Sequence, residues 1–410
     1  ELMIVLDVSN SMLAQDIKPN RLEKAKMAIV LVTGQSNSAG AESNYEEAPS
    51  AEGRYKGRYL VTNSMDWSLS VGSMSIENAV YTAEHGGKPE NPLGSWSKFP
   101  WGAGAANQLG ARLSDEWDMT VWVVNAGRSG YRIDYFDPTY SDPHGYTSII
   151  NYMNKAYTLA EENGHYIVDK EKTGMFWIQG CSNGAFSGHH SKSMEEYRTM
   201  FMNMYEGLKK DIGINYCGIW LVRAGKSTNS DEDFYMSGPR MAQIFMGNSS
   251  AEKYKDIYLV LNTDIWRFDE GVKNHYINRY SDKVKFEEYY GYSFPETLDA
   301  IKPGIHYSQK GYNEMGDIAG EVMSKIMSNN SGNVTLARLY DYYGNPVTAE
   351  GFKMRANEEE IAIPVVENVY YNAGFDLTVK CDNEAVANFD NESFKLKGIK
   401  KGETTVKVYY

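Results

Sequence analysis

The chain contains little cysteine, fewer basic than acidic residues and no long apolar run, and each shortage excludes a class of function. Three cysteines in 410 residues (Cys181, Cys217 and Cys381) are too few and too scattered for a disulfide framework or a metal cluster, and we expect all three to be free. The net charge of −13 argues against a nucleic-acid partner, because phosphate binding needs a basic footprint. No run approaches the roughly eighteen apolar residues of a membrane-spanning helix. We also expect no cofactor and no bound metal.

What is present points first to a serine that follows an apolar strand. Residues 29–33 form a continuous apolar run, as expected for a buried parallel strand, and Gly34 supplies a tight turn before Ser36. A hydroxyl there lies at the carboxyl edge of a sheet, near backbone N–H groups and the positive end of a helix. That position suits a nucleophile with an oxyanion site. The alternative is a serine that only caps the helix.

Three later segments carry further groups that serine chemistry requires. Two strands end in glycine turns, at Gly127 and at Gly180, and His306 lies on a loop before a helical stretch from Asn313 to Met327. Attack of a serine on an acyl carbon needs a base within hydrogen-bond reach and donors directed at the developing oxyanion. The four segments together therefore favour a nucleophilic serine over a cap.

These four segments resemble, in the right order, the sequence blocks of the SGNH hydrolases, and within them the sialate O-acetylesterases and acetylxylan esterases. The resemblance covers residues 27–327 and implies an α/β three-layer sandwich with a flavodoxin-like parallel sheet. It also implies a serine esterase that removes O-acetyl groups from a glycan such as a sialic acid or xylan. The four blocks read GQSN, NAGRSG, WIQGCSN and GIHYSQKGY.

The resemblance assigns a role to each block. Ser36 would be the nucleophile, His306 the general base, and Gly127 and Gln179 the oxyanion donors, with Asn183 as an alternative donor. Neighbouring residues would contact the substrate, namely Gln35, Asn37, Arg128 and His189.

The chain departs from the family pattern at two positions. Cys181 stands where the family has a glutamate that braces the site. Pro303 stands three residues before His306, where the family has an aspartate that orients and stabilises the imidazole. Three replacements stay open: a Ser-His dyad, a carboxylate such as Asp299, or a backbone carbonyl. We favour the dyad or the carbonyl, because residues 302–304 are expected to form a turn that separates Asp299 from the histidine ring.

Several aromatic residues lie beside the blocks, in a chain with 31 tyrosines. Tyr131, Tyr135 and Phe136 follow the second block, and Trp266 and Phe268 follow a later strand. Aromatic rings suit the apolar C–H faces of sugars, but for any single one of these residues we favour ordinary packing beneath long loops.

The pattern along the chain predicts a parallel sheet with helices on both faces. Ligands of such sheets bind at the carboxyl ends of the strands, where all four blocks fall. Residues 44–100 are expected to be largely loop. The predicted strands are 29–33, 59–62, 120–124, 174–178, 217–222 and 257–261, and the clearest helical patterns are 193–210 and 314–327.

The two ends of the chain differ in character from the centre. Residues 1–26 resemble the first strand and D-x-S-x-S motif of a von Willebrand factor A domain, with Asp7, Ser9 and Ser11 as oxygen groups of an incomplete magnesium shell. We interpret this segment as an appended fragment.

After a polar linker at 328–333, residues 334–410 alternate in short runs typical of a small β-sandwich. They resemble the bacterial Ig-like (group 2) domains. This resemblance favours an extracytoplasmic bacterial protein and a domain that contacts a cell surface or polysaccharide.

Three functions are therefore open. The leading one is a carbohydrate O-acetylesterase that acts on Ser36 with His306. The second is a catalytically impaired glycan-binding protein, indicated by Cys181 and Pro303. The third is a cation-dependent adhesion protein, indicated by the two ends of the chain.

Overall fold

The computed structural model describes residues 24–40, 59–63, 71–76, 104–184, 190–222, 237–249, 251–262, 307, 309–328, 336–341, 347, 353–367, 378–391 and 393–409. Its larger part is a seven-stranded sheet in which every pairing is parallel. The strand order is β2-β3-β1-β5-β6-β7, and β4 pairs with β1. The strands are β1 (Ala25–Gly34), β2 (Tyr59–Asn63), β3 (Thr120–Asn125), β4 (Tyr166–Val168), β5 (Gly174–Ile178), β6 (Cys217–Leu221) and β7 (Ile257–Asn262).

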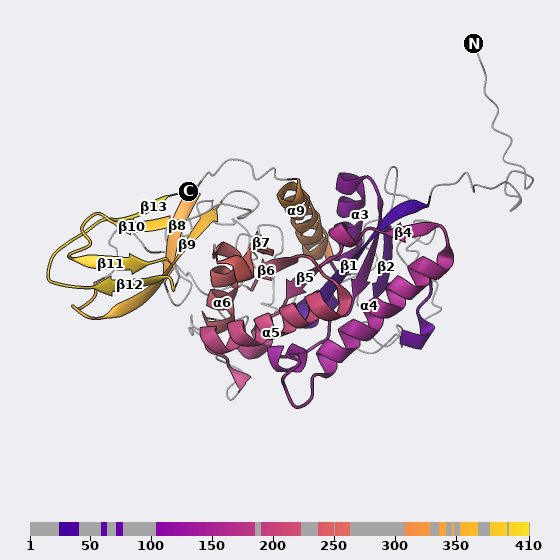
Figure 1. Ribbon diagram of the computed structural model, residues 1–410, viewed down its shortest axis with the longest axis horizontal. Helices are drawn as coiled ribbons and strands as arrows, with labels where there is room; N and C mark the ends of the chain where they lie inside the picture. The colour runs from indigo at the N-terminus through magenta and orange to yellow at the C-terminus, as the bar shows by residue number, and fades with distance from the viewer. Residues whose placement is uncertain are drawn as a thin grey trace, which may run out of the picture.

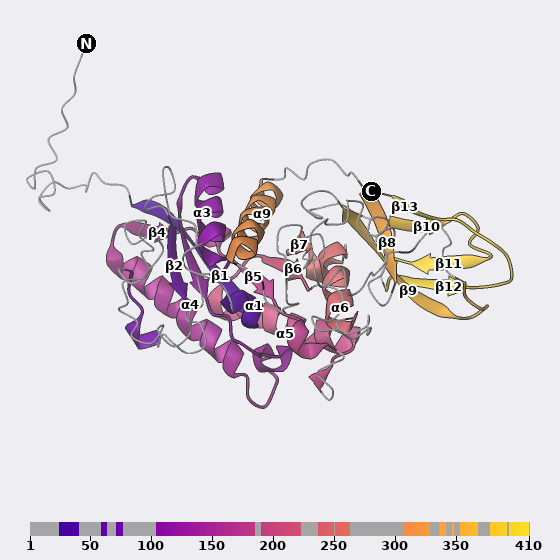
Figure 2. The same cartoon turned by 180° about the vertical axis from the view of Figure 1, so that it is seen from behind.

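Helices cover both faces of this sheet, as the sequence predicts. Side chains of α4, α5 and α6 pack with one face in one buried apolar cluster, and those of α3 and α9 pack with the other face in a second cluster. In both views α3 and α9 lie above the sheet, while α4 and α5 lie below it (Figures 1 and 2). The helices are α1 (Ser36–Ala39), α3 (Ala106–Trp117), α4 (His144–Asn163), α5 (Met194–Ile212), α6 (Ser237–Asn248) and α9 (Gln309–Met327).

The six predicted strands are all present, and a helix lies at each of the two predicted positions. The predicted start of α5 at 193 is one residue from the observed start, and Ser193 caps the helix in a capping box with Glu196. By contrast, α9 begins at Gln309, five residues before the predicted 314, because that first turn carries no apolar periodicity. Short 3₁₀ turns occur at η5 (Val71–Ser73), η8 (Ile133–Phe136), η9 (Lys170–Lys172), η10 (Cys181–Asn183) and η12 (Glu252–Tyr254).

The order of the strands determines where a ligand site can form. From β1 the chain first builds β3 and β2 on one side and later builds β5, β6 and β7 on the other. The carboxyl end of β1 is therefore the point at which the strand order reverses, the usual place for a binding crevice in an open α/β sheet. Ser36 follows that end directly.

One predicted boundary is wrong. We expected residues 1–26 to be an appended fragment, but β1 begins at Ala25 and its first residues pair with β4. The Lys26 ammonium also lies 3.4 Å from a carboxylate oxygen of Asp169. Ala25 and Lys26 therefore belong to the sheet. Asp7, Ser9 and Ser11 lie outside the described residues, as does most of the expected loop at 44–100 and all of the linker except Ser328.

The C-terminal part, here called the β domain, consists of two antiparallel sheets. One has the order β11-β12-β9-β8, and the other pairs β10 with β13. The alternating pattern of the sequence predicted an all-β fold here, while the assignment to the Ig-like domains stays a prediction. Its strands are β8 (Leu336–Asp341), β9 (Glu359–Glu367), β10 (Thr378–Cys381), β11 (Ala387–Asp390), β12 (Lys395–Gly398) and β13 (Val406–Tyr409).

Two further expectations can be compared with the described residues. None of Cys181, Cys217 and Cys381 forms a disulfide, as predicted. Among the helices that the structure describes, none combines the length and apolarity needed to cross a bilayer.

Candidate active site

The turn after β1 fixes the position of Ser36. Gly34 has φ of 135°, and a Cβ on it would lie 2.1 Å from the carbonyl oxygen of Ile178, so only glycine fits between the strands. The next N–H, that of Gln35, donates to the same carbonyl at 3.0 Å. Ser36 then begins α1, which ends after one turn at Gly40 in the left-handed conformation. The serine is 6% exposed.

The second block packs against this helix from the side. Asn125 Nδ2 donates to the carbonyl of Ser38 at 2.9 Å, and a Cβ on Gly127 would lie 2.3 Å from Ser38 Oγ. Gly127 therefore allows the two segments to approach closely. Its N–H donates to Asn125 Oδ1 at 3.0 Å, so an oxyanion role for this group would require that bond to be shared or broken.

The amide of Gln35 has a defined orientation. Its Oε1 accepts hydrogen bonds from the N–H of Gly180 at 3.0 Å and the N–H of Ser182 at 3.1 Å. Because both partners can only donate, the atom that faces them must be the oxygen. The Nε2 group is therefore on the other branch of the amide, and no described residue accepts a hydrogen bond from it.

Gln179, the oxyanion donor that the resemblance implies, has different surroundings. Its Nε2 donates to the carbonyl of Tyr131 at 3.2 Å and to Asn183 Oδ1 at 2.8 Å. Its Oε1 accepts from the Tyr197 hydroxyl at 2.5 Å. Both amide hydrogens are thus engaged within the protein, and the side chain is the centre of a buried network.

Asn183, the alternative donor, is fully buried in the same network. Its Oδ1 also accepts from the N–H of Ile133 at 2.8 Å, and its Nδ2 donates to Asp134 at 3.3 Å and to the carbonyl of His190 at 3.0 Å. These bonds join the third block to the loop after β3. Asn183 therefore holds these two segments together and is not exposed to the pocket.

A charge pair ends this network. Lys192 Nζ lies 3.0 Å from Asp134 Oδ1, and both side chains are largely buried. Burial on its own would raise the pKa of the Asp134 carboxyl, but the hydrogen bond and the charge of Lys192 outweigh it, so the pKa is held below its ordinary value of 3.8.

This shift predicts how the pair contributes to stability. Because the folded-state pKa of Asp134 is lowered, the contribution is present above the unfolded pKa and is lost as the pH falls through the folded one. We expect Lys192→Met to cost about 3 kcal/mol at neutral pH, since it leaves a buried carboxylate unpaired. Urea unfolding near neutral pH and below about pH 3 checks this, because the difference between the two proteins should shrink in acid. If the free energies of unfolding of the two proteins differed by the same amount at both pH values, the ion pair of Lys192 with Asp134 would not be the cause.

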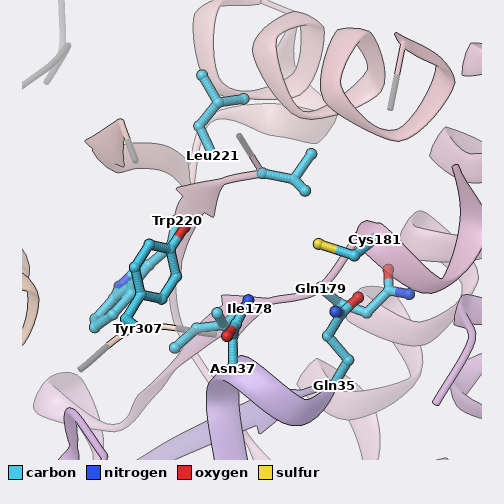
Figure 3. Close-up of a pocket in the computed structure, with 9 residues that line it drawn as sticks. Gln35, Asn37, Ile178, Gln179, Cys181, Trp220, Leu221 and Tyr307 are labelled. Atoms are coloured by element: carbon cyan, nitrogen blue, oxygen red, sulfur yellow. The ribbon is translucent and has the colours of Figure 1, made fainter. Parts of the chain in front are cut away.

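A pocket opens in front of the third block. Figure 3 shows Gln35, Gln179 and Cys181 on one side of it and Tyr307 and Trp220 on the other. The sequence singled out four of its members, while the contribution of β6 and Tyr307 was missed. The lining residues are Gln35, Asn37, Ile178, Gln179, Cys181, Trp220, Leu221, Val222 and Tyr307.

The last block joins this pocket through its tyrosines. Tyr307 follows His306 in the sequence, lines the pocket and packs edge-on against Tyr312 at 5.6 Å between ring centroids. The Tyr312 hydroxyl donates to Asn37 Oδ1 at 3.0 Å, which connects α9 to the residue after Ser36. His306 itself lies outside the described residues, as do His189, Asp299, Pro303, Trp266 and Phe268.

None of the other predicted contacts that the structure describes is among the residues lining this pocket. The Arg128 side chain is 1% exposed, with its guanidinium 6.0 Å from the ring of Tyr131. Phe136 is buried against Trp177, so it is a core residue and not a sugar platform. Tyr131 and Tyr135 are half-buried and pack on one another at 5.1 Å.

Some residues of the site carried no signal in the sequence. Tyr197 lies inside α5, and Arg240 and Gln243 lie inside α6, where each reads as an ordinary helix residue. Within the described ranges, no group of three His, Cys, Asp or Glu side chains is placed to hold a metal ion.

The fold and the pocket define an α/β protein with a buried serine at the carboxyl end of the central strand of its sheet. The family follows from a comparison with known sequence families. Residues 26–264, more than half of the chain, match the family described as "Carbohydrate esterase, sialic acid-specific acetylesterase", and the chain belongs to this family.

The solved structures to which the chain shows similarity include the following two. A protein from Arabidopsis thaliana is 13% identical, with a TM-score of 0.42, and the match covers 75% of this chain and 99% of that one. A carbohydrate acetylesterase from Xanthomonas citri is 12% identical, with a TM-score of 0.40, and the match covers 90% of this chain and 71% of that one. No curated protein matches the chain.

Proposed function

We propose that the protein is a serine esterase that removes O-acetyl groups from a glycan, with Ser36 as nucleophile and His306 as general base. Membership of a carbohydrate esterase family supports the reaction class. The observation that carries the assignment of the nucleophile is positional: Ser36 begins α1 at the carboxyl end of β1, between the pocket-lining residues Gln35 and Asn37. Such a position combines a nucleophile with nearby N–H donors.

The proposed reaction has two halves. Ser36 Oγ attacks the acetyl carbon and gives its proton to His306, and the tetrahedral intermediate then expels the sugar hydroxyl, which takes that proton. An acetyl-serine remains. His306 next takes a proton from a water molecule, which attacks the acetyl-serine, and the release of acetate restores the serine hydroxyl.

We further propose that Gln35, and not Gln179, supplies the side-chain oxyanion donor. The carbonyl oxygen of the Gln35 amide is held by two backbone N–H groups, which orients the amide before substrate binds. Gln179 instead has both Nε2 hydrogens engaged with Tyr131 and Asn183. Gln179 then stabilises the conformation of the segment WIQGCSN through its hydrogen bonds. Gln35, which the sequence placed among the substrate contacts, is instead proposed to be a catalytic residue.

The assignment of His306 rests on the sequence block and on its described neighbour. Tyr307 lines the same pocket as Gln35 and Asn37, and the Tyr312 hydroxyl bonds Asn37. These contacts support a catalytic role for the block GIHYSQKGY.

The partner of His306 can be tested by substitution. We propose that His306 works as a dyad or with a backbone carbonyl, because Pro303 replaces the usual aspartate. Asp299→Asn is then expected to change turnover of an acetate ester less than about threefold, whereas loss of a triad carboxylate costs about 10⁴. Pro303→Asp is expected to raise turnover by restoring a partner. A loss of several orders of magnitude in Asp299→Asn would show instead that Asp299 is the third member.

Two experiments address the reaction and its substrate. Turnover of a chromogenic acetate ester separates an esterase from the second candidate, a glycan-binding protein with an impaired site, which Cys181 and Pro303 favour. Acetate release from acetylated xylan, sialic acids and mucin glycans then identifies the sugar. An extracytoplasmic location and a surface-binding role for residues 334–410 belong to the same proposal.

A further inference from the structure

The β domain and the α/β domain share a buried aromatic contact. The ring of Phe394, in the turn before β12, lies 4.9 Å from the ring of Phe245 on α6. The two residues are 2% and 3% exposed and belong to one buried apolar cluster. Strand β9 also contacts α6, and Figure 1 shows the β domain next to this helix. The β domain therefore covers an apolar part of α6.

Phe394 adopts an unusual backbone conformation at this contact. Its φ is 53°, in the left-handed region, which costs a bulky residue about 1–2 kcal/mol. The Phe394 carbonyl accepts a hydrogen bond from the N–H of Ala362 in β9 at 2.9 Å, which fixes the turn. A strained residue of this kind persists only where its surroundings hold it. Burial of the ring against α6 offsets the strain.

The same helix holds two residues that hydrogen-bond to residues lining the pocket. Gln243 Oε1 accepts from the N–H of Val222 at 2.8 Å, and its Nε2 donates to the carbonyl of Gln179 at 2.6 Å. Arg240 Nη1 donates to the carbonyl of Val222 at 2.7 Å. Arg240 and Gln243 are about one turn apart and fully buried on one side of α6, while Phe245 lies on another side.

We propose that the β domain is a structural part of the catalytic site: Phe394 fixes α6, and Gln243 and Arg240 of that helix position Val222 and Gln179 in the pocket. Gln243 is thus a positioning residue, since it acts through Gln179 and Val222. The catalytic part of this inference rests on the proposed esterase function. A spacer domain, as the Ig-like resemblance implies, would have no such effect on the pocket.

Hydrogen exchange of the full-length protein tests the proposal without reference to activity. We expect Phe394→Ala and Gln243→Met each to speed exchange of the Val222 amide about tenfold, because that N–H loses a rigid acceptor. Val379→Ala is the matched control, since Val379 is also buried in the β domain but lies in the other sheet. Amides of β1 are the internal reference and should not change.

Kinetics with an acetate ester give the second readout. Phe394→Ala is expected to lower kcat about tenfold with KM little changed, since a small displacement of a catalytic pocket reduces rate more than binding. Phe394→Leu should recover part of the loss because it restores apolar bulk. Gln243→Glu keeps the acceptor for Val222 but cannot donate to Gln179, so its activity should fall between those of the wild type and Gln243→Met.

The outcomes separate this inference from the proposed function. Faster Val222 exchange in Phe394→Ala and Gln243→Met, but not in Val379→Ala, supports the coupling even if the wild type hydrolyses no ester. Unchanged exchange in either of the first two variants overturns it, even if the wild type is an active esterase. If Phe394→Ala and Val379→Ala speeded Val222 exchange equally, and circular dichroism showed that both proteins are folded, the coupling could not be assigned to Phe394.

Discussion

Ser36→Ala is expected to abolish ester hydrolysis while the protein stays folded. The side chain loses one oxygen, so packing around α1 changes little, but no atom remains to form the acetyl intermediate. Removal of the catalytic serine of a well-characterised serine protease lowers turnover by about six orders of magnitude. Turnover of a chromogenic acetate ester measures the effect, and circular dichroism confirms the fold.

Ser38→Ala is the matched control for this variant, because it removes a second buried hydroxyl from the same helix. Ser38 Oγ donates to the carbonyl of Gln35 at 2.5 Å, so its loss is expected to cost about 1 kcal/mol of stability. Its activity should stay far above that of Ser36→Ala. If Ser36→Ala kept a near-normal rate, the assignment of the nucleophile would be wrong.

Gln35→Glu is expected to lower kcat by about 10²- to 10³-fold with little change in KM, the effect of losing one oxyanion donor. Glutamate has nearly the same shape and still accepts from the N–H groups of Gly180 and Ser182. However, it places a second oxygen where the amide N–H₂ stood, so it repels the developing oxyanion. Steady-state kinetics on an acetate ester separate kcat from KM.

Gln179 provides the comparison that distinguishes the two glutamines. If Gln35 is the donor, Gln179→Ala acts only through the network with Tyr131, Asn183 and Tyr197, and its cost should appear in stability as well as in rate. A large loss of kcat in Gln179→Ala beside a nearly normal Gln35→Glu would return the oxyanion role to Gln179.

The sequence was most informative where local signals agree. Apolar runs located six strands of the sheet, three of them ending in glycine turns, and helical periodicity located α5. Strand β4 was missed because it has only three residues, none of them fully buried. The predicted strand 29–33 left out the first four residues of β1, of which Ala25 and Lys26 are exposed and adjoin a segment that resembles another family.

The site was less predictable because roles depend on hydrogen-bond partners that meet only in the folded protein. The sequence placed Gln35 and Gln179 at one sheet edge, and both line the pocket. It could not tell which amide is engaged by its neighbours, since those neighbours come from η10, from the loop after β3 and from α5. Gln243 is the clearest case, because nothing around it in the sequence marks it as a partner of Gln179.

Covalent labelling of the active serine tests the central claim most directly. A phosphonate reagent that reacts with activated serines is incubated with the wild type and with Ser36→Ala, and the modified peptide is mapped by mass spectrometry. Our account predicts a single adduct on Ser36 in the wild type, loss of acetate-ester turnover in step with its formation, and no adduct in Ser36→Ala. An adduct on another residue that removes activity, or full turnover after Ser36 is modified, would contradict it.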